Sequence, residues 1–105
     1  MYSDEITVQE LKKQFDNEIE VALLDVRNTR EREVCHLGGI LIPLAELPQR
    51  LSELDLNKEW IVYCRSGKRS EDAVEFLNES GFKAKNLKGG IVAWHYEIDE
   101  NFPIY

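Results

Sequence analysis

The sequence is poor in cysteine and proline and has no long apolar segment. Its 105 residues include two cysteines, three prolines and six glycines. Two cysteines cannot build the disulfide framework of a small secreted domain. No apolar run approaches the ~20 residues that span a bilayer, and the acidic, polar residues 1–5 are unlike a secretory signal. These features predict a cytoplasmic protein without a membrane segment.

Positive charge is also scarce. Twenty acidic residues against thirteen lysines and arginines give a formal net charge of −7 at pH 7. Such a balance argues against binding to nucleic acid or to an anionic membrane surface. A hydrophobic content of 43% is enough for one core, and this length predicts a single domain over residues 1–105. Nothing in the sequence specifies an oligomeric state.

Apolar residues recur alternately at helical and strand spacings. Helices are predicted at residues 8–16, 44–54, 70–80 and 91–94. Strands are predicted at residues 21–25, 40–42, 60–63 and 82–87. The charged stretch 26–36 is predicted as a loop with a helical turn, and 82–87 as a half-exposed edge strand. This alternation predicts an α/β fold with a largely parallel central sheet.

Several of the few basic residues gather around one cysteine. Cys64 comes directly after the predicted strand 60–63. Arg65, Lys68 and Arg69 follow Cys64, before the predicted helix 70–80. Backbone N–H groups and the helix dipole favour an anion at such a position. Neighbouring cations favour the thiolate form of a cysteine, which is the nucleophilic form. We therefore expect Cys64 to be a nucleophile rather than an inert buried thiol.

The residues that follow Cys64 are suited to an anion-binding loop. Ser66 supplies a hydroxyl donor, and Gly67 tolerates the backbone angles that aim successive N–H groups at one point. A thiolate in such a loop can attack phosphorus or arsenic, or it can attack a sulfane sulfur and become a persulfide. Cysteine phosphatases commonly place arginine six positions after the cysteine, whereas Arg69 is five positions after Cys64. The smaller loop favours sulfur transfer, with a phosphatase or arsenate reductase as the alternative.

The chain resembles the single-domain members of the rhodanese-like sulfurtransferase family. The matching segments are Leu24-Asp25-Val26-Arg27, His36-Leu37 with Gly39, Ile42-Pro43-Leu44, residues 62–70, Gly81-Phe82, and Leu87-Lys88-Gly89-Gly90 with Ala93-Trp94. The resemblance implies a five-stranded, mainly parallel sheet flanked by helices on both faces. It also implies that Cys64 carries the persulfide and that residues 65 to 69 form the active loop.

The same resemblance suggests partners and supporting residues. The donor would be a small anion such as thiosulfate, or a persulfide, and the acceptor a thiol, cyanide or a sulfur-carrier protein; we expect no cofactor and no metal ion. Asp25 and Arg27 match an acid and a base near the active loop. They form either a charge pair that shapes the pocket or, in the simpler interpretation, Asp25 only caps the next turn.

The role of Cys35 and the catalytic competence of the domain each have two interpretations. Cys35 precedes the matched histidine, where many relatives have glycine. It could resolve an oxidised Cys64 as a disulfide, or it could be a small buried side chain. Rhodanese-like domains also occur as inactive partners, so a noncatalytic binding module is a further alternative to an enzyme.

Overall fold

A five-stranded sheet forms the centre of the computed structural model, which describes residues 4–105. The first three residues of the predicted domain lie outside the described part. The strands are β1 (Glu5–Ile6), β2 (Ala22–Asp25), β3 (Ile40–Leu41), β4 (Glu59–Tyr63) and β5 (Lys83–Leu87). Their order is β1-β5-β4-β2-β3, and every neighbouring pair is parallel. The predicted α/β architecture is therefore confirmed.

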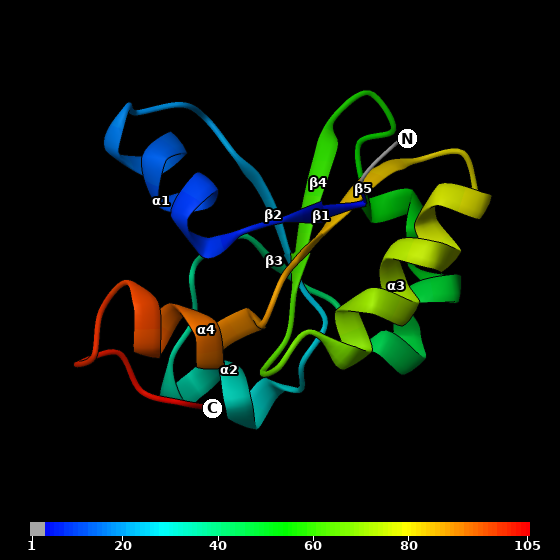
Figure 1. Cartoon of the computed structure of the whole chain (residues 1–105). Coiled ribbons are helices and arrows are strands. Elements are labelled where there is room, and N and C mark those ends of the chain that lie inside the picture. The colour runs from blue at the N-terminus through cyan, green and yellow to red at the C-terminus, as the bar shows by residue number, and fades with distance from the viewer. Residues whose placement is uncertain (1–3) are drawn as a thin grey trace.

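Helices cover both faces of this sheet (Figure 1). They are α1 (Val8–Asp16), α2 (Thr29–Val34), α3 (Lys68–Glu79) and α4 (Gly90–Glu97). A capping box between Thr7 and Glu10 starts α1, and a second box between Asn28 and Glu31 starts α2. No helix within residues 4–105 has the length and apolar character needed to cross a bilayer.

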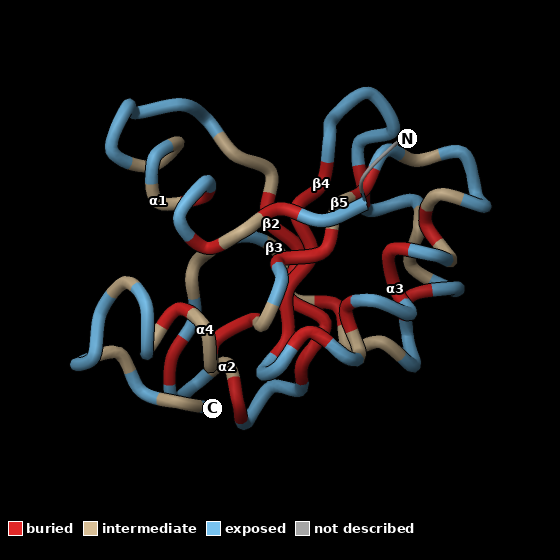
Figure 2. The backbone as a smooth tube through the Cα atoms, viewed as in Figure 1, coloured by how far each residue is buried: buried red, intermediate tan, exposed pale blue. Residues whose placement is uncertain are grey.

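Alternate residues of the central strands face opposite sides of the sheet. Trp60 and Val62 of β4 pack in the core cluster beneath α3, whereas Ile61 and Tyr63 pack in the cluster that holds the apolar side chains of α1 and α4. Because β4 is buried on both faces, its residues 60–63 form a continuous apolar run. Figure 2 shows the buried residues concentrated along these strands. Cys64 directly follows β4, which is the central strand of this buried sheet.

The prediction of one helix over residues 44–54 is wrong. This segment forms two 3₁₀ helices, η1 (Leu44–Gln49) and η2 (Leu51–Glu53). Pro48 lies inside η1, and a proline has no N–H with which to continue an α-helical ladder. The 3₁₀ form is common in such short pieces. Leu47 and Leu54 are nevertheless buried, as the apolar spacing of this segment indicates.

The prediction of β5 as an edge strand is also wrong. One side of β5 pairs with β4, and the other pairs with β1, where Glu5 lies opposite Asn86 and Ile6 opposite Leu87. The alternation that suggested a half-exposed strand is present, because Lys83 is exposed and Ala84 is buried. The two residues of β1 are too few to show a strand periodicity, so the covering strand could not be predicted.

Candidate active site

The loop that follows β4 curls around the sulfur of its own first residue. Gly67 adopts a left-handed conformation (φ 96°) immediately before α3. The turn brings the N–H groups of Gly67 and Ser70 to 3.1 and 3.4 Å from Cys64 Sγ. Ser70 Oγ lies 3.3 Å from the same sulfur. Cys64 is buried, and its sulfur lies in a nest of donors at the N-terminus of a twelve-residue helix.

The three cations of the loop have different surroundings. Arg65 and Lys68 are exposed, as is Ser66, and neither cation forms an ion pair with a residue that the structure describes. Arg69 instead forms a two-pronged ion pair with Glu31, with N–O distances of 2.7 and 2.8 Å. Two positive charges are therefore available to an anion near the loop, while the third is already neutralised.

Glu31 is a site residue that the sequence interpretation missed. Hydrogen bonds from Arg69 lower the pKa of Glu31, and the same bonds raise the pKa of Arg69. Because the carboxylate pKa is lower in the folded chain, the stabilisation is present above the unfolded value of about 4.3. It is lost as the pH falls through the folded value. The only sequence signal at Glu31 was its position three residues after Asn28. That spacing marks a capping box and so the start of a helix, but it does not predict a contact with Arg69.

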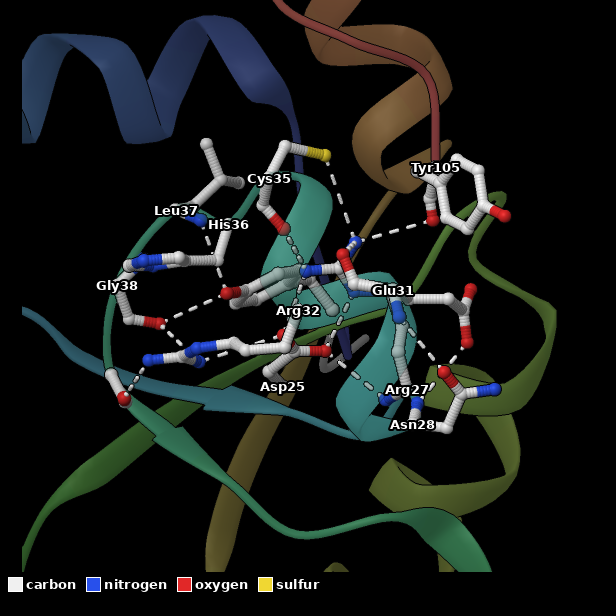
Figure 3. A network of polar contacts seen from close by, with 12 residues as sticks. Asp25, Arg27, Asn28, Glu31, Arg32, Cys35, His36, Leu37, Gly38 and Tyr105 are labelled. Carbon is white, nitrogen blue, oxygen red and sulfur yellow. Dashed lines mark hydrogen bonds and ion pairs between the residues drawn. The ribbon is translucent and has the colours of Figure 1, made fainter.

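Asp25 and Arg27 form a fully buried ion pair (Figure 3). The Arg27 guanidinium donates to both carboxylate oxygens of Asp25, at 2.9 and 2.8 Å, and the Arg27 backbone N–H donates to one of them at 3.1 Å. Asp25 therefore pairs with Arg27 and also accepts a backbone N–H of the following turn; a part in shaping the pocket stays a prediction. Burial acts to lower the pKa of Arg27, but the hydrogen bonds and charge of Asp25 outweigh burial and raise it.

The remaining Arg27 contacts connect this pair to other segments. Its guanidinium donates to the carbonyl oxygen of Cys35 at 2.7 Å, to that of Tyr105 at 3.2 Å and to that of Glu31 at 3.5 Å. The last contact reaches α2, whose Glu31 holds Arg69 of the loop. Among the described residues, no hydrogen bond joins Asp25 or Arg27 to Cys64. The pair is thus connected to the loop through Glu31 of α2.

Cys35 is a small buried side chain rather than a neighbour of Cys64. It belongs to the core cluster beneath α1 and α4, whereas Cys64 belongs to the cluster on the α3 face. Its sulfur lies 3.6 Å from the carbonyl oxygen of Pro103 and 3.8 Å from Nη1 of Arg27. Both thiols are free. This placement does not support a resolving role for Cys35.

The start of α4 supports the backbone of the Cys64 loop. The N–H groups of Ile91 and Val92 donate to the carbonyl oxygens of Cys64 and Arg65, at 3.1 and 2.9 Å. A Cβ atom on Gly90 would lie 2.3 Å from the Cys64 oxygen and 2.8 Å from the Arg65 oxygen. The sequence predicts only a turn at Gly89-Gly90. In the structure, the missing side chain of Gly90 allows α4 to approach the loop.

Gly90→Ala should destabilise the fold and disturb the loop, because the added methyl group meets backbone oxygens that cannot rotate away. We expect a loss of roughly 1–3 kcal/mol in unfolding free energy beyond that of a matched substitution. Gly81→Ala is the matched control, since Gly81 also has a positive φ but has open space at its Cβ position. Urea unfolding of both variants measures the difference. Equal losses would contradict this role of Gly90.

Comparisons with known proteins identify the family. The profile of the rhodanese-like domain matches residues 7–97. The putative sulfurtransferase YtwF of Bacillus subtilis is 36% identical over 94 residues, covering 89% of this chain and 91% of that protein. The putative sulfur carrier protein YrkF of the same organism is 37% identical over 92 residues, covering 86% of this chain and 50% of that protein.

A solved structure agrees with these sequence relatives. The rhodanese-like domain protein from Staphylococcus aureus superposes with a TM-score of 0.83 at 32% identity, covering 97% of this chain and 98% of that chain. Nearly the whole of both chains is therefore aligned. The chain belongs to the rhodanese-like domain family.

Proposed function

We propose that this protein is a sulfurtransferase that moves a sulfane sulfur through a persulfide on Cys64. The observation that carries the proposal is the nest of N–H donors around Cys64 Sγ at the start of α3. Such a nest stabilises a negative sulfur without any rearrangement of the backbone. Membership of the family and the sulfurtransferase name of a full-length relative support sulfur transfer in general.

The proposed reaction has two displacement steps. The Cys64 thiolate first attacks the outer sulfur of thiosulfate; the S–S bond of thiosulfate breaks, and sulfite leaves with the bonding electron pair. The enzyme then carries a persulfide, Cys64–S–S⁻. An acceptor thiolate attacks the terminal sulfur, and the Cys64 thiolate leaves with the electron pair. The two steps restore the enzyme, and the sulfur passes from donor to acceptor without an external oxidant or reductant.

The charges around the loop suit a small anionic donor. One sulfur atom would enter the nest, while Arg65 and Lys68 would attract the anionic remainder of the donor. Arg69, the residue best placed in sequence to clamp a tetrahedral oxyanion, already pairs with Glu31. Because Arg69 is paired, it is not free to bind a tetrahedral oxyanion. The pairing and the short loop therefore both favour sulfur transfer over phosphatase or arsenate reductase activity. A relative named as a sulfur carrier suggests a sulfur-carrier protein as one acceptor.

Mass spectrometry after exposure to thiosulfate tests the proposal. We expect one added sulfur on the peptide that contains Cys64, and its removal by a small thiol. Parallel reactions with an organic persulfide, a phosphotyrosine analogue and arsenate define the substrate class. Turnover of the phosphate ester or arsenate without any persulfide on Cys64 would reject sulfur transfer. Partner binding by Cys64→Ala protein, with no turnover of any donor, would instead favour the binding module.

Glu31→Gln should improve the use of thiosulfate, because it removes the charge that holds Arg69. A partly exposed ion pair is worth less than roughly 1 kcal/mol, so we expect KM for thiosulfate to fall by about threefold. Glu33→Gln is the matched control: it changes the net charge equally from an exposed position on the same helix. An equal fall in KM for both variants, measured by steady-state kinetics, would attribute the effect to net charge alone.

A further inference from the structure

The hydroxyl group of Ser70 lies between two acceptors at the base of the nest. Its oxygen is 2.5 Å from Oδ1 of Asn86 on β5 and 3.3 Å from Sγ of Cys64. Ser70 and Asn86 are both buried. A hydroxyl group carries one proton and can donate it to only one of these partners at a time. The direction of this proton therefore bears on the state of the sulfur.

The orientation of the Asn86 amide is fixed by the loop itself. Its Nδ2 atom lies 3.1 Å from the carbonyl oxygen of Gly67, which can only accept a hydrogen bond. The amide nitrogen must therefore face Gly67, and the amide oxygen must face Ser70. Since that oxygen can only accept, the Ser70 hydroxyl donates to Asn86. The lone pairs of Ser70 then face Cys64, and a neutral thiol completes the chain by donating its S–H to Ser70.

A negative sulfur requires the opposite arrangement. The N–H groups of Gly67 and Ser70 already point at the sulfur, and the backbone fixes their direction. The lone pairs of the Ser70 hydroxyl would repel a thiolate, so the hydroxyl must turn its proton to the sulfur. Asn86 Oδ1 then loses its donor inside the core, which is unfavourable. Ionisation of Cys64 and the hydrogen bond to Asn86 thus compete for one proton.

We propose that Asn86 is a positioning residue that competes with Cys64 for the Ser70 proton and so limits how readily the thiol becomes a thiolate. The inference rests on the proposed function in taking Cys64 as the nucleophile. The balance between thiol and thiolate matters because Cys64 attacks the donor sulfur in the first step and leaves from the persulfide in the second. A more stable thiolate leaves more readily but is a weaker nucleophile, and an attacking thiol is best when it ionises near ambient pH. Asn86 acts on this balance by competing for the Ser70 proton.

The test is the pH profile of Cys64 alkylation by iodoacetamide in the reduced protein, read from the Cys64 peptide by mass spectrometry. Asn86→Leu removes the competing acceptor at similar side-chain size. We expect its profile to move to lower pH, with alkylation about tenfold faster below the wild-type midpoint. Asn86→Asp supplies a stronger acceptor and a negative charge, so its profile should move to higher pH.

Two controls separate this role from simple bracing of the loop. Asn78 also joins α3 to β5, through hydrogen bonds of 2.9 and 3.3 Å to the backbone of Ala84, and Asn78→Leu should leave the profile unchanged. In a Ser70→Ala background, Asn86→Leu should no longer move the profile, because the contested proton is absent.

Shifts of the same sign for Asn86→Leu and Asn86→Asp would overturn the proposal, because a loosened loop would affect both alike. A persisting shift in the Ser70→Ala background would also overturn it. Alkylation requires no sulfur donor, so the result is readable even if the protein transfers no sulfur. Conversely, a persulfide on Cys64 together with shifts of the same sign would reject the Asn86 role and leave the proposed function intact.

Discussion

Cys64→Ser is expected to abolish sulfur transfer, with a loss of at least about a thousandfold in kcat/KM. A serine hydroxyl is not ionised near neutral pH, and an oxygen in place of the sulfur cannot form the persulfide. The loop around residue 64 should keep its conformation, because serine fills nearly the same space as cysteine. The serine oxygen can also accept the hydrogen bonds that the N–H groups of Gly67 and Ser70 now donate to the sulfur. The measurement pairs steady-state kinetics with intact-mass detection of the added sulfur.

Cys35→Ser is the control for this loss. Its sulfur packs in the other core cluster, so the variant should still gain one sulfur and turn over. Its hydroxyl can donate to the carbonyl oxygen of Pro103, which the thiol now contacts. If Cys64→Ser protein still acquired a sulfur that a thiol could remove, the nucleophile would lie elsewhere. Loss of transfer in Cys35→Ser alone would point to a resolving role that the structure does not support.

Asp25→Asn should cost about 3–5 kcal/mol of unfolding free energy, because it leaves the buried Arg27 guanidinium without its counter-charge. The total stability of a domain is typically about 5–15 kcal/mol, so such a loss should markedly lower the urea midpoint. Arg32 lies 3.5 Å from the same carboxylate and is only partly exposed, so it would add to the unbalanced positive charge. Urea unfolding followed by circular dichroism measures the change.

Two comparisons sharpen this prediction. Asp16→Asn removes one partner of the exposed Lys12–Asp16 pair on α1 and should have little effect, since exposed pairs contribute under about 1 kcal/mol. Replacing both members of the buried pair, as Asp25→Leu with Arg27→Met, should cost less than the sum of the two single substitutions. A midpoint for Asp25→Asn close to that of Asp16→Asn would contradict the importance of the buried pair.

Most of the strands and the position of the nucleophile were accessible from the sequence. Apolar runs such as residues 60–63 predict buried parallel strands, and the position of Cys64 after that run predicts a thiol at the carboxyl edge of the sheet. Helical spacing of apolar residues predicts a helix over residues 8–16, the bounds that α1 has in the structure. These features are local, because a few neighbouring residues determine them. Local signals therefore predicted most elements and the loop of the candidate site.

Contacts between distant segments were beyond such signals. Glu31 and Arg69 are 38 positions apart in the chain, and Ser70 and Asn86 are 16 apart. No spacing rule connects them, because their proximity depends on how two strands and two helices pack. Arg69 shows the consequence: its sequence position predicts a cation aimed at the substrate, yet its guanidinium pairs with α2. The role of Gly90 likewise depends on a distant segment, because a Cβ there would meet the carbonyl oxygens of Cys64 and Arg65.

The pairing of β1 with β5 has a consequence for synthesis on the ribosome. The first strand of the described chain finds its partner only when residues 86 and 87 have been made, since Ile6 lies opposite Leu87. The amide of Asn86 and the supporting turn at Gly90 are likewise synthesised well after Cys64. In a nascent chain that ends before Asn86, the Cys64 loop would lack the hydrogen bonds from Asn86 and from the start of α4. Organisation of the nucleophile therefore follows the synthesis of residues 86–87, with which the sheet closes.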